Sequence, residues 1–391
     1  MDIHTLDLHW YDYLIFLVYN VMFTYVFYSI GQIRHLEKKV LRNIVLLYQV
    51  LFVLILVNLF YPFIPVRTES TYYAYMLNTS LYPQDAPNNL MAVYYIAIYT
   101  KIVCLNSPFI FIMMCNFFLA CGLVIFLAGF QTFGKVSNRQ IYIMSLLLLC
   151  YPALYIFHSD LGRIGFSIFA FAIFLRGNLA YRTGEKPLKM LLGAILISAI
   201  NIRIAPFIFL LLVYTFLDKA GVRSLYRWMV TAVLLLLGAV VYGLITGIQS
   251  PEALAEERNM LLDNPTLLLF GNVQWQHWGQ VLIDSIFIAL QGIATPFPIF
   301  SNFPLGEHPV LLVDGIFYVA CLILALWALM QNKKAFPGWQ ALITYLILVA
   351  SGELSLMLAA ENRIFILLCL LPLTAQQITR LGGEKPQEHA H

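Results

Sequence analysis

The stretch that decides the fold is SPFIFIMMCNFFLACGLVIFLAGF, residues 107–130, which is uncharged and almost wholly apolar. A helix needs about 20 such residues to cross the hydrocarbon core of a bilayer. Similar runs recur along the chain of 391 residues, of which 61% are hydrophobic and 11% charged. A soluble domain carries about a quarter charged residues. The composition therefore excludes a disordered chain, a coiled coil and a water-soluble enzyme, and it predicts an all-α polytopic membrane protein.

We expect about eleven transmembrane helices, because that many apolar runs approach the length of a span. Their approximate ranges are 11–30, 43–63, 107–130, 140–157, 161–178, 190–202, 204–217, 229–247, 309–330, 339–357 and 364–378. The adjacent runs 190–202 and 204–217 fit either two short helices or one long broken helix. Two further apolar stretches, 89–104 and 280–298, are expected to be re-entrant or interfacial helices on the outer face. The alternative is that both cross the membrane.

The distribution of basic residues sets the expected orientation. Of the 23 Lys and Arg residues, 17 fall in the stretches 31–42, 131–139, 176–189, 218–228, 333–334 and 380–385. Because basic residues favour the cytoplasmic side, we expect these stretches inside the cell. The N-terminus carries Asp2, Asp7 and Asp12 and no basic residue, so we expect it to be periplasmic and not a cleaved signal. The C-terminus is then cytoplasmic.

This topology predicts a single integral membrane domain over residues 1–391. It has two large periplasmic loops, 64–106 and 248–308. The net charge of +3 is too small to indicate a nucleic-acid partner. No Walker A, GxGxxG, HExxH or GxSxG motif is present, so any donor substrate is expected to be in the membrane or outside it.

Five arginines remain on the expected outer side: Arg67, Arg163, Arg203, Arg258 and Arg363. Arg163 and Arg363 are expected to open spans, and Arg203 to separate two short ones. An arginine at such a depth is costly unless it is paired or faces a polar cavity. Because guanidinium matches phosphate in geometry, several together favour a pocket for a lipid-linked phosphate or diphosphate.

A purely structural role for each arginine is the alternative. Arg163 can pair with Asp160, and Arg363 with Glu361, or each side chain can extend to the interface. Arg258 stands beside two glutamates, and we expect it to be a solvated loop residue.

Four stretches carry a resemblance to a known family. They are VRTESTYYAYML (66–77), HSDLGRIGFSIFAFAIFLRG (158–177), LLGAILISAINIRIAPFIFLLLVY (191–214) and ENRIFILLCLLPL (361–373). In order and layout they resemble the Wzy/EpsG class of O-antigen and exopolysaccharide polymerases. These are polytopic proteins of the bacterial inner membrane with an early outer loop that contains arginine. The resemblance covers most of the chain in layout, through loose motifs.

The resemblance implies a glycosyl transfer at the periplasmic face. The growing glycan leaves undecaprenyl diphosphate and joins the non-reducing end of a new lipid-linked repeat unit. Arg163, Arg203 and Arg363 would bind the diphosphate, and Arg67 would lie at the substrate entrance. With arginine supplying the charge, neither a metal nor another cofactor is expected. The candidate bases for the acceptor hydroxyl are Asp160, His158 and Glu361. The partners would be the lipid-linked oligosaccharide, membrane lipid and, as a further candidate, a chain-length regulator protein.

Two other functions are weighed against the polymerase. A glycosyltransferase that uses a polyprenyl-phosphate sugar usually has an acidic pair in its first outer loop, whereas the first connector here is basic. A flippase for lipid-linked oligosaccharide would have charged residues through the mid-membrane of both halves and no large outer loops. The one-sided arginines and the two long loops therefore favour an enzyme.

Overall fold

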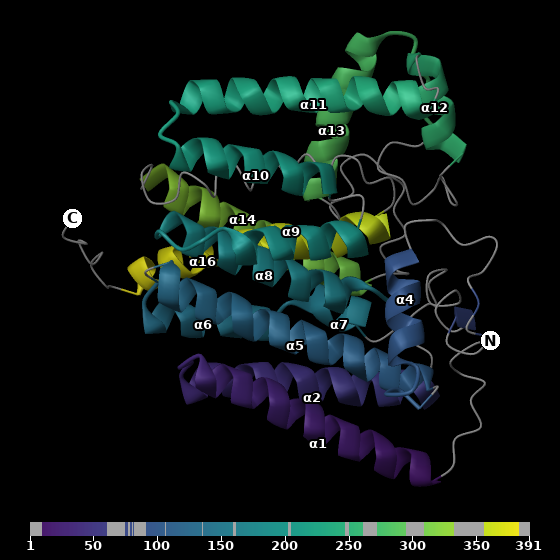
Figure 1. The fold of residues 1–391 in the computed structure, drawn as a ribbon, viewed down its shortest axis with the longest axis vertical. Coiled ribbons are helices and arrows are strands. Elements are labelled where there is room, and N and C mark those ends of the chain that lie inside the picture. Colours follow the sequence, from purple (N-terminus) through teal and green to yellow (C-terminus); the bar gives the residue numbers. More distant parts are fainter. Residues whose placement is uncertain are drawn as a thin grey trace. The chain divides into compact units, whose positions relative to one another are not determined.

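Helices and the turns that join them make up the described part of the chain in the computed structural model (Figure 1). The structure describes residues 10–60, 75–76, 79, 81, 91–105, 107–134, 136–158, 162–201, 205–246, 250–260, 272–294, 309–331 and 356–382. No strand occurs among these residues. The chain divides into two compact units, Met1–Ala205 and Pro206–His391, and each is described by itself.

Eight described helices belong to the first unit. They are α1 (Trp10–Ile33), α2 (Lys38–Phe60), α4 (Met91–Thr100), α5 (Pro108–Phe133), α6 (Asn138–Leu149), α7 (Pro152–His158), α8 (Ile164–Arg182) and α9 (Leu188–Ile200). Short connections join all of them except α2 and α4, which are separated by residues 61–90. The uncharged stretch 107–130 forms most of α5. Its first turn is capped by the Ser107 side chain, which accepts a hydrogen bond from the backbone of Ile110, and Pro108 occupies the first helical position.

Helix α5 forms the centre of the first unit. It packs against α1 and α2 on one side and against α8 on another, and α8 in turn packs against α9 (Figure 1). Nearly every described side chain of α5 is buried. A helix that is apolar all round belongs in the interior of a bundle, so its neighbours and not lipid cover most of α5.

Glycines let α8 approach α5 and α9 at backbone distance. A Cβ atom on Gly122 of α5 would lie 2.8 Å from the Cα of Phe169 on α8. Between α8 and α9 the contact is reciprocal: a Cβ on Gly177 would lie 2.3 Å from the Met190 nitrogen, and one on Gly193 would lie 2.3 Å from the Phe174 nitrogen. Small residues at such contacts are typical of helix pairs in membranes, where close van der Waals packing drives association.

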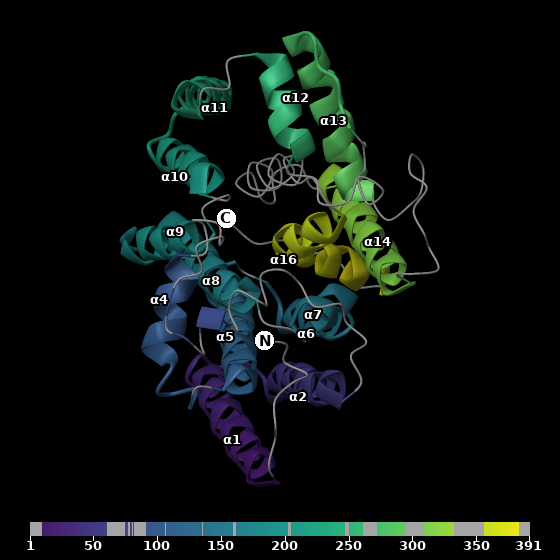
Figure 2. The same cartoon turned by 90° about the vertical axis from the view of Figure 1, so that its right-hand side faces the viewer.

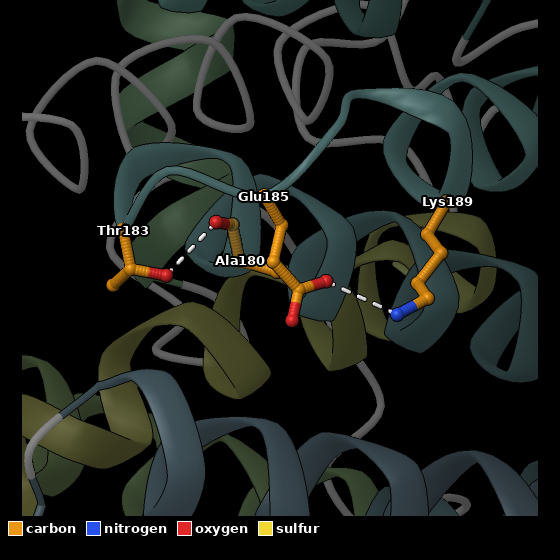
Figure 3. Close-up of polar contacts among 4 residues, drawn as sticks. All are labelled: Ala180, Thr183, Glu185 and Lys189. Atoms are coloured by element: carbon orange, nitrogen blue, oxygen red, sulfur yellow. Dashed lines mark hydrogen bonds and ion pairs between the residues drawn. The ribbon is translucent and has the colours of Figure 1, made fainter.

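The turn from α8 to α9 ends α8 at a glycine. Gly184 has a φ of 110°, a conformation that glycine adopts without strain, and the backbone N–H of Glu185 donates to the Ala180 carbonyl (3.0 Å). The Thr183 hydroxyl donates to the same carbonyl (2.8 Å), and Lys189 pairs with Glu185 across one turn (3.1 Å; Figure 3). The two hydrogen bonds satisfy the Ala180 carbonyl near the end of α8, and the ion pair joins this turn to the start of α9.

Polar side chains join α2 to its neighbours within the apolar bundle. The Gln49 amide on α2 donates to Thr24 (3.0 Å) and Asn20 (3.2 Å) of α1, and it accepts from the Asn20 amide (2.9 Å). On another face of α2, the Asn43 amide donates to the Ser145 hydroxyl of α6 (2.9 Å). Such bonds fix how α2 is rotated against α1 and α6, because an amide in this environment needs its partner.

In the second unit, successive helices again follow short turns or undescribed segments. They are α10 (Ala205–Lys219), which begins at the unit boundary, α11 (Ser224–Thr246), α12 (Pro251–Met260), α13 (Trp278–Ala294), α14 (Pro309–Gln331) and α16 (Leu356–Leu381). Helices α14 and α16 lie side by side, and α12 runs beside α13 (Figure 2). The Thr374 hydroxyl of α16 donates to the Cys321 carbonyl of α14 (3.0 Å).

The described helices correct some of the expected spans. The expected helix 140–157 is two helices, α6 and α7, because Pro152 has no N–H to continue a helix and restricts Tyr151 before it. The short pair at residues 190–217 is two separate helices, α9 and α10. The last helix begins at Leu356 and not near residue 364, and most of the expected span 339–357 lies outside the described residues.

Within the described residues, six helices are long and apolar enough to cross a membrane: α1, α2, α5, α8, α14 and α16. The chain is thus an all-α, multi-pass membrane protein by the length and composition of its helices. The expected number of eleven spans stays a prediction. Helix α4, with 10 residues, is about 15 Å long, half the thickness of the hydrocarbon core, and so does not cross alone.

Candidate functional site

The start of α8 carries the first candidate residue. Arg163 directly precedes the helix, and only 4% of its surface is exposed. The chain arrives there from α7, whose last residue is the buried His158. Asp160, between them, lies outside the described residues. The sequence-based position of Arg163 at the beginning of a helix is confirmed.

Helix α5 supports the junction between α7 and α8. The Asn116 amide donates to the backbone carbonyl of His158 (3.0 Å), which ties the end of α7 to α5. Gly165 brings the first turn of α8 onto α5, since a Cβ there would lie 2.1 Å from the Cys115 carbonyl oxygen. The structure thus gathers buried polar groups where three otherwise apolar helices meet.

Asn116 and Ser167 are polar residues of this junction that the sequence argument missed. Both are buried, and neither the Asn116 Oδ1 nor the Ser167 hydroxyl has a hydrogen-bond partner among the described residues. A signal for Asn116 was present, since it is the one amide side chain in the uncharged stretch 107–130. A polar side chain within an apolar span is costly unless it has a hydrogen-bond partner, and the carbonyl at the end of α7 is that partner for Asn116.

The electrostatics of the junction favour an anion. The N-terminus of a helix carries a partial positive charge and free N–H groups. Arg163 adds a full positive charge at that end of α8, within a region of low dielectric constant. Two sources of positive potential at one buried point raise the affinity for a negatively charged group, and phosphates are typical ligands of such helix ends.

The second described candidate, Arg363, lies in the other unit, within α16. It is fully buried, and its Nη2 lies 3.8 Å from Oδ2 of Asp314 on α14. The guanidinium carbon lies 5.5 Å from the centre of the Tyr318 ring. The expectation that Arg363 opens the last helix is wrong, because α16 begins at Leu356. Local sequence pointed to Glu361 as the neighbouring acid, whereas the described ion pair reaches Asp314 on another helix.

The remaining candidates are distributed as follows. Arg67 and Arg203 lie outside the described residues, the latter between α9 and α10. Glu361 belongs to α16, two residues before Arg363. Arg163 and Arg363 belong to different units: Arg163 follows His158 by five residues in the first unit, and Arg363 pairs with Asp314 in the second. Convergence of the arginines on one pocket stays a prediction.

Arg258 differs from the expectation of a solvated residue. It is 6% exposed, and its guanidinium lies over the ring of Trp275, 5.8 Å from the ring centre. The indole N–H of Trp275 donates to Asp284 of α13 (2.8 Å). Burial lowers the pKa of Arg258, and the nearby Asp284 carboxylate opposes that shift. Trp275 is itself buried, so its ring does not form an exposed platform for a sugar.

Asn259 connects α12 to the segment before α13. Its amide donates to the Val273 carbonyl (2.9 Å), and its Oδ1 accepts from the Val273 N–H (3.0 Å). We expect Asn259→Ala to destabilise this pair of helices by about 2 kcal/mol, because two hydrogen bonds are lost. Limited proteolysis in detergent should then cut residues 250–294 faster than in the wild type. The exposed Gln274→Ala variant is the control, and equal cleavage of both variants would contradict the pairing.

Across the described ranges, no cluster of three or more His, Cys, Asp or Glu side chains could hold a metal ion.

Comparisons with protein families, with curated proteins and with solved structures find no match.

Proposed function

We propose that this chain is a glycosyltransferase that polymerises oligosaccharide repeat units carried on undecaprenyl diphosphate, at the periplasmic face of the bacterial inner membrane. The observation that carries the proposal is a buried arginine, Arg163, at the N-terminus of the apolar helix α8, with the buried His158 at the end of the preceding helix α7. An anionic headgroup attached to a lipid matches this combination of charge and apolar surroundings. The diphosphate of a polyprenyl donor has that chemistry.

In the proposed reaction, a hydroxyl of the incoming lipid-linked unit attacks the anomeric carbon of the growing glycan. The new glycosidic bond forms as the bond from that carbon to the diphosphate oxygen breaks. The hydroxyl proton passes to a base, and the electron pair of the broken bond leaves with undecaprenyl diphosphate. Negative charge thus grows on the diphosphate, which is where a guanidinium lowers the barrier.

The roles follow from these charges. Arg163, Arg203 and Arg363 are the proposed diphosphate-binding residues that stabilise the leaving group, and Arg67 is proposed to lie at the substrate entrance. His158 is a candidate base because an imidazole changes protonation near neutral pH. Asp160 and Glu361 are the other candidates for the base. Arginine supplies the charge that a metal provides in other transferases, so the proposal needs no cofactor.

The deciding experiment is analysis of the surface glycan after deletion of the gene. A polymerase predicts loss of the long-chain ladder together with a surviving band of one repeat unit, and a plasmid copy of the gene should restore the ladder. Total loss of surface glycan would overturn the proposal in favour of a flippase or an earlier transferase. An unchanged ladder would also overturn it.

The same proposal can be tested with purified components. The full chain, reconstituted in vesicles with an undecaprenyl-diphosphate-linked oligosaccharide, should release undecaprenyl diphosphate as glycan dimers and longer products appear. No nucleotide sugar or ATP is supplied. Release of the lipid carrier without longer glycan would indicate hydrolysis and would contradict a polymerase.

A further inference from the structure

Three helices of the first unit run in the same direction, beginning with α1 and α5. Phe16 of α1 stacks on Phe109 of α5, with 4.0 Å between the ring centres, and Phe23 stacks on Phe117 with 4.7 Å between them. The residue numbers rise together along the two helices, so the helices are parallel. The chain therefore leaves α1 and α5 at the same end of the unit.

Helix α8 is parallel to α5 as well. A Cβ on Gly122 of α5 would lie 2.8 Å from the Cα of Phe169, and one on Gly129 would lie 3.1 Å from the Cβ of Arg176. The residue numbers again rise together. The turns that follow α1, α5 and α8 therefore lie at one end of the first unit (Figure 1).

These three turns concentrate positive charge at that end. Residues 34–42, 138–139 and 182–189 contain eight Lys or Arg residues and two Glu residues. Groups from different helices also come close together, because the charge of Arg34, just after α1, acts on Arg176 of α8. The fold thus gathers basic residues that are far apart in the sequence into one positive surface.

The first of the turns leads into a face of α2 that changes from charged to apolar. Lys38, Lys39 and Arg42 are exposed in the first two turns of the helix. The exposed positions that follow them are apolar: Leu46, Val50, Val53 and Val57. Steps of three or four residues place all of these side chains on one face of a helix. The bonds from Asn43 and Gln49 to neighbouring helices hold the other faces of α2 inward.

The three cations at the start of this face are not used inside the fold. None of Lys38, Lys39 and Arg42 forms an ion pair with an acid among the described residues, although Glu37 is adjacent in sequence. Helix α2 is long enough to span a membrane, so its charged first turns lie at the level of the lipid headgroups. The face therefore presents positive charge to headgroups and apolar side chains to acyl chains.

We propose that Lys38, Lys39 and Arg42 bind the phosphate group of an anionic phospholipid, whose acyl chains lie along the exposed apolar face of α2. Basic residues next to a membrane span attract anionic headgroups, and their apolar stems extend along the helix toward them. The basic residues of the other two turns add positive potential at the same end. This is the end that the distribution of basic residues predicts to be cytoplasmic. The site is separate from the proposed glycosyl transfer.

The test measures the binding of two phospholipids to the full chain in detergent by native mass spectrometry. The wild type should bind phosphatidylglycerol, which has a net negative charge, more tightly than phosphatidylcholine, which has none. One Lys or Arg near an anionic lipid surface strengthens the attraction about fivefold. We expect the Kd of phosphatidylglycerol to rise about fivefold in Arg42→Gln and about a hundredfold when Lys38→Gln and Lys39→Gln are added. The Kd of phosphatidylcholine should stay the same.

Three controls separate this site from other effects of charge. Lys101→Gln removes one positive charge before the start of α5, away from the three turns, and should leave both Kd values unchanged. Lys38→Arg with Lys39→Arg keeps the charge and should bind as the wild type does. Glycerol 3-phosphate, which has the phosphate but no acyl chains, should not displace phosphatidylglycerol at equal concentration.

Each contrary result would overturn the inference. A wild type that binds the two phospholipids equally well has no such site. If Arg42→Gln and the triple variant bind phosphatidylglycerol as the wild type does, the basic residues act only on the orientation of the chain during insertion. An equal loss in Lys101→Gln would show a general effect of charge, and displacement by glycerol 3-phosphate would show a site for soluble anions. If the triple variant does not accumulate, Arg42→Gln and Lys101→Gln decide.

Discussion

We expect replacement of Arg163 by alanine to abolish long-chain glycan while the protein still inserts into the membrane. The guanidinium is proposed to bind the leaving diphosphate. Loss of one contact that stabilises a charged transition state lowers the rate of the reaction by about 10²-fold to 10³-fold. Insertion is expected to survive, because α8 keeps the length and the apolar composition of a membrane span. The measurement is the length distribution of the glycan from cells that carry the variant, with the amount of protein in the membrane checked by immunoblot.

Arg182→Ala is the matched control for this variant. It removes an arginine from the same helix, α8, at the opposite end, where the side chain donates a hydrogen bond to Asn178 (3.0 Å). Chain length should be unchanged in this control. Arg163→Lys should recover part of the activity, since an ammonium supplies the charge but not the two-pronged geometry of guanidinium. A glycan of normal length from Arg163→Ala would remove Arg163 from the site.

The largest expected effect on stability comes from Gly193→Ala. The added methyl group would lie 2.3 Å from the backbone nitrogen of Phe174 and 2.5 Å from its Cα, and a neighbouring backbone cannot rotate away as a side chain can. We expect a loss of about 3 kcal/mol in unfolding free energy, at the upper end of the range for overpacked cores. Thermal unfolding in detergent, followed by circular dichroism, measures this change.

Gly279→Ala is the control for that substitution. A Cβ at Gly279, in the first turn of α13, meets no atom within 4 Å. Without a clash, alanine restricts the unfolded chain more than glycine does, so this variant should be as stable as the wild type or more stable by about 0.5 kcal/mol. The two variants make the same chemical change, with opposite expected signs. A Gly193→Ala protein with the same melting temperature as the wild type would contradict the close contact of α8 and α9.

Features that depend on neighbouring residues in the chain were predictable. The apolar runs predicted helices and lipid as their solvent. Of the two possibilities left open for residues 190–217, the structure has two separate helices, and α9 ends before Asn201. Arg163 was expected at the start of a helix, and it is there. Pro152, by contrast, was a local signal that the span 140–157 left unused, and it divides α6 from α7.

Partners on other helices were not predictable. Arg363 pairs with Asp314, which lies on a helix that ends 25 residues before α16 begins. Arg258 has two glutamates beside it in sequence, yet the tertiary structure buries it against Trp275. Asn116 became part of the candidate site only because α7 ends beside α5.

The amino-acid sequence alone was enough to predict that lipid surrounds this protein, that its apolar runs are helical, and where several of the helices begin or end. These properties follow from hydropathy and from backbone constraints that act over a few residues. Only the tertiary structure decided which charged and polar groups meet. That choice depends on how each helix is rotated and how closely it approaches its neighbour, and both are set by packing between residues far apart in the chain.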